Sequence, residues 1–316
     1  MDYVLSTDNL VKSYGQARAL SGLSMHVPKG AIYGIVGRNG AGKTTLIRLI
    51  CGLQRPTSGT YSIYGREFTS RDIRLSRRRM GAVVETPSIY LDMSARENLR
   101  QQYRVLGLPS FEGIDELLAL VGLADTGKKR ARNFSLGMKQ RLGIAVALCG
   151  GPDFLILDEP VNGLDPEGII EMRELILRLN RERQITVLIS SHILDELARL
   201  ATHYGFIDGG RMVREMSAAE REDSLSYTAE ELEAACRKSM RLEVTDTGAL
   251  ARVLDAMGAD YRILSEDTAD VYERLNVSQL AAALAREGCE LVSVKERDES
   301  LESFYISIVG GGARHV

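Results

Sequence analysis

Residues 37–44 read Gly-Arg-Asn-Gly-Ala-Gly-Lys-Thr, which fits the phosphate-loop pattern GxxxxGK[ST]. An apolar run over 31–36 predicts a buried strand before the loop, and residues 44–53 have the apolar spacing of a helix. Glycines let backbone N–H groups curl around phosphates, and the positive end of the helix points at them. A glycine turn that merely contains a lysine is the alternative, but the strand and the helix both fall where the pattern requires. We therefore expect nucleotide contacts from Gly37, Asn39, Gly40, Ala41, Gly42, Lys43, Thr44 and Thr45.

Specific chemical roles are predicted for four side chains. Lys43 should reach the β- and γ-phosphates, and the Thr44 hydroxyl should hold Mg²⁺. A second apolar run, residues 154–157, ends in two carboxylates. Of these, Asp158 would help to hold Mg²⁺, and Glu159 would orient and deprotonate the attacking water. An apolar run before two acidic residues is common where a strand enters a polar turn, but beside a phosphate loop it indicates a nucleoside triphosphatase.

Alternation of buried strands with helices predicts an α/β layered core. Short apolar runs at 154–157 and 186–189 flank an amphipathic stretch from Gly168 to Arg183, which predicts strand, helix and strand. The region at about 90–150 is dominated by helical patterns. The charge is uneven, because residues 1–216 hold 29 basic and 23 acidic side chains, whereas residues 217–316 hold 11 and 20. This asymmetry indicates a domain boundary near residue 217 and anionic ligands for the first part.

The last part of the chain contains a repeated pattern. Two segments thirty positions apart each read as a helix, a glycine stop and a strand, with matched leucines and glycines at Leu250 and Leu280, Leu254 and Leu284, and Gly258 and Gly288. With further strands this predicts βαββαβ, the ferredoxin-like arrangement of an α+β domain. Chance similarity of two α–β units is the alternative. We therefore expect three parts: 1–216, an acidic linker at 217–238, and an accessory domain at 239–316.

Several classes of protein are excluded by simple patterns. The longest apolar runs are far shorter than the ~20 residues that cross a bilayer, so a membrane role would come through a partner. The N-terminus lacks the basic start and apolar stretch of a secretory signal. A disulfide framework or a zinc site is not expected, because the four cysteines lie far apart without CxxC spacing: Cys51, Cys149, Cys236 and Cys289.

Further motifs accompany the phosphate loop and the acidic pair at residues 158–159. Asn133 to Arg141 reads NFSLGMKQR, residues 158–166 read DEPVNGLDP, and Ser190-Ser191-His192 follows the next strand. Over about residues 4–216, the chain resembles the nucleotide-binding subunit of ABC transporters. The resemblance implies a P-loop NTPase core with a β-subdomain and a helical subdomain, ATP and Mg²⁺ as ligands, and a homodimer that closes on the nucleotide.

The same resemblance implies individual roles for five more residues. Tyr14 corresponds to the aromatic residue that stacks on adenine, and His192 to the switch histidine that contacts the γ-phosphate. Ser135 and Gly137 correspond to the signature element, which binds the γ-phosphate held by the opposite subunit. Asp165 corresponds to the D-loop aspartate, which lies between the two subunits. Without the family context, His192 reads as a polar turn residue and Tyr14 as a strand-end aromatic.

The chain departs from the family pattern in three of its motifs. The signature reads FSLGM instead of LSGGQ, and Val161 replaces the usual threonine. Glu85 stands where the family carries a glutamine, and a carboxylate ~5 Å from a γ-phosphate charge is repelled by about 3 kcal/mol at an effective dielectric constant of 20. Glu85 is therefore a nucleotide and metal ligand of changed character, is displaced from the site, or reflects neutral drift.

Glu85 also indicates a branch of the family. Its Glu-x-Pro surroundings resemble the bacitracin- and lantibiotic-resistance exporters, and residues 299–304 resemble the "SLE" segment of drug-exporter ATPases. The resemblance implies a peripheral subunit at the cytoplasmic face of the membrane, beneath polytopic permease subunits, that drives export of a peptide antibiotic, lantibiotic or other hydrophobic compound. A soluble ABC ATPase acting on ribosomes or DNA, and an importer ATPase with a C-terminal regulatory domain, are the alternatives. Nucleic acid is not expected as a partner, because the basic clusters lack interleaved aromatic residues.

Overall fold

The computed structural model describes residues 2–192, 194–217, 239–272 and 275–297. The chain forms two compact units, Met1–Thr228 and Ala229–Val316. The predicted acidic linker lies outside the described residues except for Ser217, which ends a strand. Within the described ranges, no helix is both long enough and apolar enough to span a bilayer.

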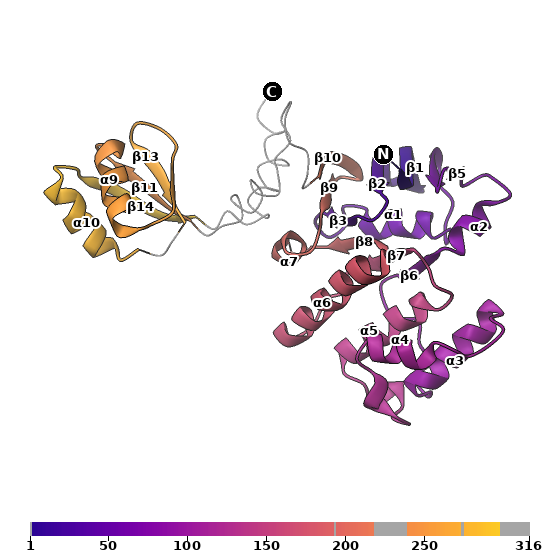
Figure 1. Cartoon of the computed structure of the whole chain (residues 1–316). Helices are drawn as coiled ribbons and strands as arrows, with labels where there is room; N and C mark the ends of the chain where they lie inside the picture. Colours follow the sequence, from indigo (N-terminus) through magenta and orange to yellow (C-terminus); the bar gives the residue numbers. More distant parts are fainter. Residues whose placement is uncertain (1, 193, 218–238, 273–274, 298–316) are drawn as a thin grey trace. The chain divides into compact units, whose positions relative to one another are not determined.

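A six-stranded sheet forms the centre of the first unit (Figure 1). Five strands are parallel, and β10 pairs with β9 in the antiparallel sense. Every residue of β3, β7 and β8 is buried, which explains why these strands read as continuous apolar runs. In spatial order the strands are β10 (Arg211–Ser217), β9 (His203–Asp208), β3 (Ile32–Val36), β8 (Thr186–Ser191), β7 (Phe154–Asp158) and β6 (Met80–Val83).

A second, antiparallel sheet packs on the first through helix α1 (Lys43–Ile50). A single apolar core contains Leu5 and Leu23 from the second sheet, Leu46 from α1, and Ile35 and Phe154 from the central sheet. The helix that follows the phosphate loop is therefore fixed on both sides. In spatial order the strands of the second sheet are β2 (Ala17–Pro28), β1 (Tyr3–Tyr14), β4 (Ser58–Ile63) and β5 (Arg66–Glu67).

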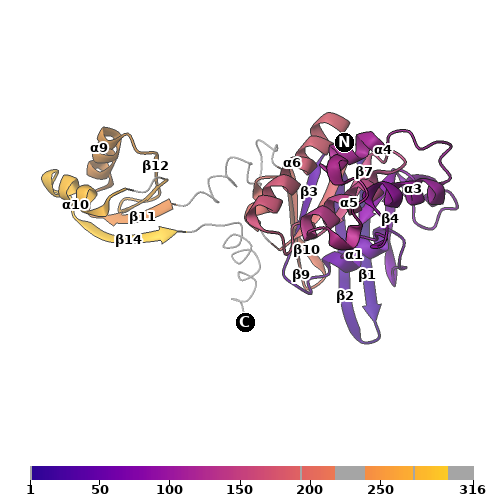
Figure 2. The ribbon, with the colours of Figure 1, turned by 90° about the horizontal axis from the view of Figure 1, so that it is seen from below.

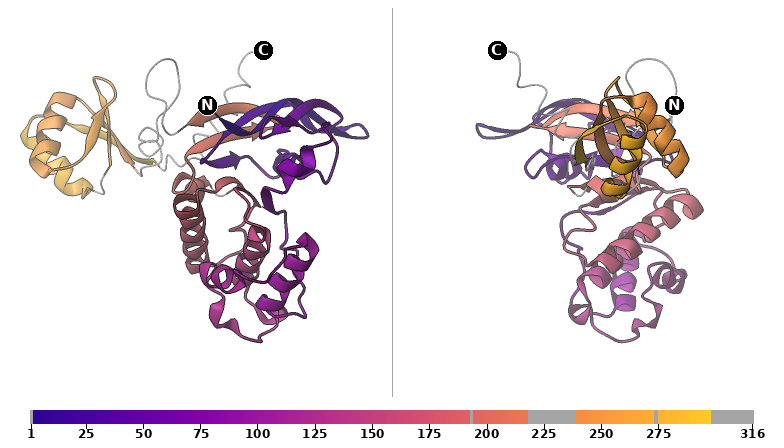
Figure 3. Two further views of the ribbon diagram at one scale, coloured as in Figure 1. Left: turned by 45° about the vertical axis from the view of Figure 1, so that its right-hand side comes forward. Right: turned by 90° about the vertical axis from the view of Figure 1, so that its left-hand side faces the viewer.

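The remaining helices of this unit include the predicted helical region. Helices α3, α4 and α5 gather at the end of the unit opposite the antiparallel sheet (Figure 3). Helix α3 begins with a capping box, in which Ser94 and Glu97 satisfy each other's backbone N–H groups. The bounds are α2 (Ile73–Arg77), α3 (Ala95–Leu106), α4 (Ile114–Leu120), two 3-10 turns (Ala124–Thr126 and Ala131–Asn133), α5 (Leu136–Leu148), α6 (Pro166–Arg183) and α7 (Leu194–Ala198).

The second unit has the element order βαββαβ, as the repeated pattern predicts. Its sheet order, β12-β13-β11-β14, is that of a ferredoxin-like fold, and both helices lie on one side of the sheet (Figure 2). The four matched leucines at 250, 254, 280 and 284 are fully buried, and both matched glycines have positive φ. The elements are β11 (Ser239–Val244), α9 (Thr247–Met257), β12 (Tyr261–Ile263), β13 (Thr268–Val271), α10 (Val277–Arg286) and β14 (Leu291–Arg297).

Burial of the thiols leads to a first prediction. Burial raises the pKa of Cys51 and of Cys149 to about 12 each. At pH 8 their thiolate fraction is then on the order of a thousandfold smaller than that of an exposed cysteine. In a Cys236→Ser variant, we expect slow reaction of these two thiols with a disulfide reagent in the native protein and fast reaction in guanidinium. Native labelling of Cys51 at the rate of an exposed thiol, located by mass spectrometry, would contradict its packing against the core of the first unit.

Candidate functional site

The phosphate loop connects the end of β3 to the start of α1. Gly42 is the N-cap of the helix and has φ 109°, a backbone conformation that residues other than glycine rarely adopt. A Cβ atom on Gly42 would lie 2.7 Å from the carbonyl oxygen of Ala19, and one on Gly37 would lie 2.6 Å from that of Ile207. Both glycines are therefore required by close backbone packing, which fixes the loop between the two sheets.

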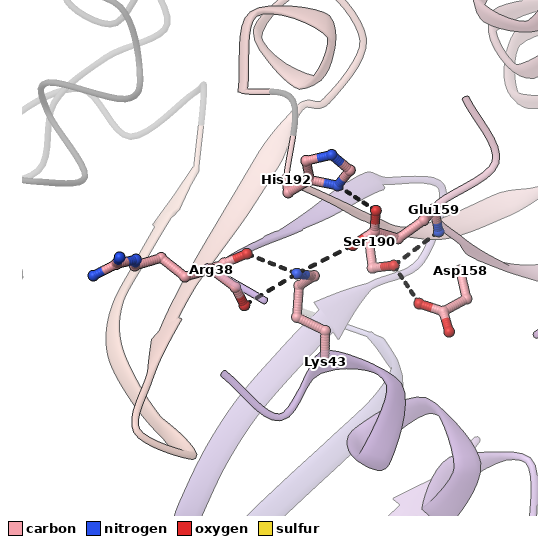
Figure 4. Close-up of polar contacts among 7 residues, drawn as sticks. Arg38, Lys43, Asp158, Glu159, Ser190 and His192 are labelled. Carbon is pink, nitrogen blue, oxygen red and sulfur yellow. Dashed lines mark hydrogen bonds and ion pairs between the residues drawn. The ribbon is translucent and has the colours of Figure 1, made fainter. Parts of the chain in front are cut away.

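Lys43 is the buried cation of the loop, with only 5% of its surface exposed. Its Nζ donates to the carbonyl oxygens of Gly37 at 2.7 Å and Arg38 at 3.4 Å, and pairs with Oε1 of Glu159 at 3.2 Å (Figure 4). The lysine therefore links the loop directly to the predicted catalytic base. Thr44 and Thr45 follow in the first turn of α1, where both are half-buried.

Asp158 ends β7 and is almost completely buried. Its Oδ1 accepts a hydrogen bond of 2.6 Å from the Ser190 hydroxyl, because β7 and β8 are neighbours with Asp158 opposite Ser190. Its Oδ2 is buried without a hydrogen-bond partner. A buried, unsatisfied carboxylate oxygen is costly unless a ligand satisfies it, and Mg²⁺ prefers oxygen ligands. The residues therefore fit Mg²⁺, which Asp158 and Thr44 would hold.

Glu159 occupies a strained backbone position with φ 51°. Its backbone N–H donates to the hydroxyl of Ser190 at 3.0 Å and to the carbonyl oxygen of the same residue at 3.1 Å. Its side chain contacts Lys43 through Oε1 and Nδ1 of His192 through Oε2 (Figure 4). Strain of this kind persists only where surrounding contacts enforce it, and it is common at active sites.

Ser190 was missing from the predicted site residues, although it begins the motif that contains His192. Its hydroxyl donates to the Asp158 carboxylate and accepts from the backbone N–H of Glu159, so Ser190 links the two acidic residues. The signal that could have found it is its place at the end of a buried parallel strand, next to the strand that carries the two acidic residues.

Ser135, Gly137 and Asp165 form a second group. Ser135 caps α5 by accepting a hydrogen bond of 3.2 Å from the Met138 N–H, and Asp165 caps α6 by accepting one of 3.0 Å from Gly168. All three line one cavity of about 410 Å³. Among the residues that the structure describes, no hydrogen bond or ion pair joins this group to Lys43, Asp158, Glu159 or His192.

Glu85 lies after β6, in a loop where its φ is 59°. Its carboxylate forms an ion pair with Arg48 of α1, and about half of the glutamate side chain is exposed. The pairing attaches the loop between β6 and α3 to the phosphate-binding helix. The metal and nucleotide roles of Glu85 remain predictions.

Tyr14 ends β1 and is 45% exposed. Its hydroxyl donates to the side-chain carbonyl of Gln54, and Lys12 lies over its ring with Nζ 5.1 Å from the centroid. An aromatic ring with an exposed surface at this position is suited to stacking on a base.

Comparison with known proteins bears on the same residues. A family model described as "ABC transporter" matches residues 20–162. The bacitracin transport ATP-binding protein BcrA of Bacillus licheniformis is 39% identical over 315 residues, 99% of each chain. The lantibiotic transport ATP-binding protein SrtF of Streptococcus pyogenes is 45% identical over 212 residues, which is 67% of this chain and 90% of that protein. A solved ATP-binding cassette, described as a dimeric post-hydrolysis state bound to ADP and Pi, matches with TM-score 0.61 and 25% identity, over 69% of this chain and 100% of that one.

The bridging hydroxyl of Ser190 leads to a second prediction. Ser190→Ala removes the donor to Asp158, and loss of such a supporting contact typically costs about 10- to 100-fold in metal affinity. We expect the Mg²⁺ concentration for half-maximal ATP hydrolysis to rise by about this factor. Thr186→Ala is the matched control, because it removes a buried hydroxyl at the other end of β8. An equal Mg²⁺ dependence in both variants would show that Ser190 serves only the fold.

Proposed function

The chain belongs to the family of ABC transporter ATP-binding subunits, and from that premise we propose that it drives export of a peptide antibiotic such as bacitracin or a lantibiotic. The family hydrolyses ATP and couples this reaction to transport, and the predicted relation to the bacitracin and lantibiotic branch is confirmed. The observation that carries the proposal is the share of both chains over which the sequences are similar. The match to the bacitracin transport protein covers 99% of both chains, and so includes the C-terminal unit as well as the ATPase unit.

The contacts of Glu159 support a role as the general base. Its carboxylate is shared between Lys43 and His192, and the triphosphate carries several negative charges that compete for the same lysine. When Lys43 turns to the phosphates, Glu159 loses its main counter-ion and keeps the hydrogen bond to His192. A carboxylate released in this way can accept a proton from the attacking water. Mg²⁺, when bound, neutralises charge that develops on the phosphates.

The two separate groups of site residues support a homodimer. Ser135, at the start of α5, offers a hydroxyl and free helix N–H groups, which together form an anion site. In one chain this anion site has no bond to the Lys43 group among the described residues. A second copy bound across the nucleotide would complete the site, and the solved cassette with this fold is described as dimeric.

Polytopic permease subunits are the proposed partners, at the cytoplasmic face of the membrane. The test is purification of the chain from its native host. Recovery with a small polytopic membrane protein, whose presence stimulates ATP hydrolysis, is the expected result. Recovery with ribosomes or DNA would support the soluble alternative, and stimulation by a solute-binding protein would support an importer.

Replacement of the proposed base gives a third prediction. Glu159→Gln keeps the size of the side chain but removes the proton acceptor, so ATP turnover should fall by about 10²- to 10⁴-fold. ATP should still produce a dimer, which size-exclusion chromatography with light scattering would detect. The control is Glu174→Gln, which changes an exposed glutamate of α6. Hydrolysis at the unmodified rate by Glu159→Gln would eliminate Glu159 as the base.

The Arg48–Glu85 ion pair gives a fourth prediction. Glu85→Gln breaks the pair and should change the ratio of permease-stimulated to basal ATPase rates by up to about fivefold, since exposed pairs contribute about 0.2–1 kcal/mol. The exchange variant Arg48→Glu/Glu85→Arg restores a pair of opposite charges. If the ion pair between these two positions determines the coupling, the exchange variant recovers the ratio of permease-stimulated to basal ATPase rates. If Glu85 is a metal ligand, the exchange is as defective as the single variants.

A further inference from the structure

The Tyr14 ring is held at two points by one turn of the chain. Its hydroxyl donates to the side chain of Gln54. Lys12 lies over one face of the ring, and its Nζ donates to the carbonyl oxygen of Arg55 at 2.9 Å. The edge and one face of the tyrosine are therefore both fixed by consecutive residues, Gln54 and Arg55.

This turn continues directly from the phosphate-binding helix. The N–H groups of Leu53 and Gln54 donate to the carbonyl oxygen of Arg48, at 2.9 and 3.3 Å. Three residues after Gln54, Thr57 joins the turn to the strand of the tyrosine. Its N–H donates to the carbonyl oxygen of Val11 at 2.8 Å, and its hydroxyl accepts from the N–H of Ser13 at 3.0 Å. The end of β1 and the end of α1 thus form one hydrogen-bonded unit.

Fixing the ring in this way has a consequence for nucleotide binding. A base that stacks on Tyr14 would approach the face of the ring opposite Lys12. Tyr14 is 45% exposed, so part of its surface is open to solvent. An exposed tyrosine that rotates freely must lose rotamer entropy when a base stacks on it. A ring already held by its hydroxyl avoids most of this cost, and because the turn extends α1, it is held at a set distance from the phosphate loop.

The geometry points to Gln54 as a positioning residue for the base of the bound nucleoside triphosphate, acting through Tyr14. The inference rests on the proposed function as an ATPase and on the predicted stacking of Tyr14 on adenine. Gln54 itself touches the tyrosine and needs no contact with the nucleotide. Its effect should therefore fall on the affinity for ATP, in KM rather than in kcat.

The experiment measures MgATP binding by calorimetry to the full chain carrying Glu159→Gln, so that hydrolysis does not interfere. Gln54→Leu and Tyr14→Phe each remove one side of the same hydrogen bond, and each should weaken binding by about three- to tenfold. The two together should weaken it no more than either alone, because they remove one interaction. Gln54→Glu retains an acceptor oxygen and should bind ATP nearly as well as the parent. Gln279→Leu, an exposed glutamine of α10, is the matched control.

A separate variant distinguishes failure of this inference from failure of the base site itself. Tyr14→Ala removes the ring and should weaken binding more than Tyr14→Phe. If Tyr14→Ala weakens binding and Gln54→Leu does not, the positioning role of Gln54 is wrong and the base site stands. If Tyr14→Ala leaves the affinity unchanged, the tyrosine does not bind the base and both proposals fall. Multiplied effects in Tyr14→Phe/Gln54→Leu would also overturn the inference, because the two residues would then act independently.

Discussion

The central constraint on this molecule is that three fully buried parallel strands end at the same edge of one sheet. Lys43 follows β3, Asp158 ends β7 with Glu159 directly after it, and His192 follows β8. Because β7 and β8 pair in register, the Ser190 hydroxyl lies where it reaches both acidic residues. A shift of either strand by one residue would reverse the direction of every side chain and dismantle the site. The site residues therefore come together only if the apolar strands of the sheet pack in the correct register.

Much of this arrangement can be predicted from local pattern, for reasons that particular residues show. Buried strands such as β3 and β7 are apolar at almost every position, so they are recognisable without an alignment. The paired leucines and glycines of the C-terminal unit are equally clear, because each leucine is buried and each glycine follows its helix with positive φ. The observed α6 begins at Pro166, two residues before its expected start, since Asp165 supplies the cap.

Contacts between distant segments could not be predicted in this way. Glu85 pairs with Arg48 across 37 positions, and Tyr14 bonds to Gln54 across 40. No sequence motif marks Arg48 or Gln54 as the partner of these residues. Their contacts depend on how β1, β6 and α1 pack. The strand β6, Met80–Val83, is also too short and too rich in small residues to be recognisable by periodicity. Local sequence patterns do not contain the tertiary packing that determines which exposed polar groups contact each other.

The left-handed backbone of Glu159 has a consequence for how such a chain can change. A residue other than glycine, asparagine or aspartate at φ 51° costs roughly 1–3 kcal/mol, which the surrounding contacts offset. Glycine or asparagine at this position would relieve that strain and remove the carboxylate. A selection for thermal stability alone would thus favour loss of the base, so a stabilised variant of this chain requires a simultaneous screen for turnover.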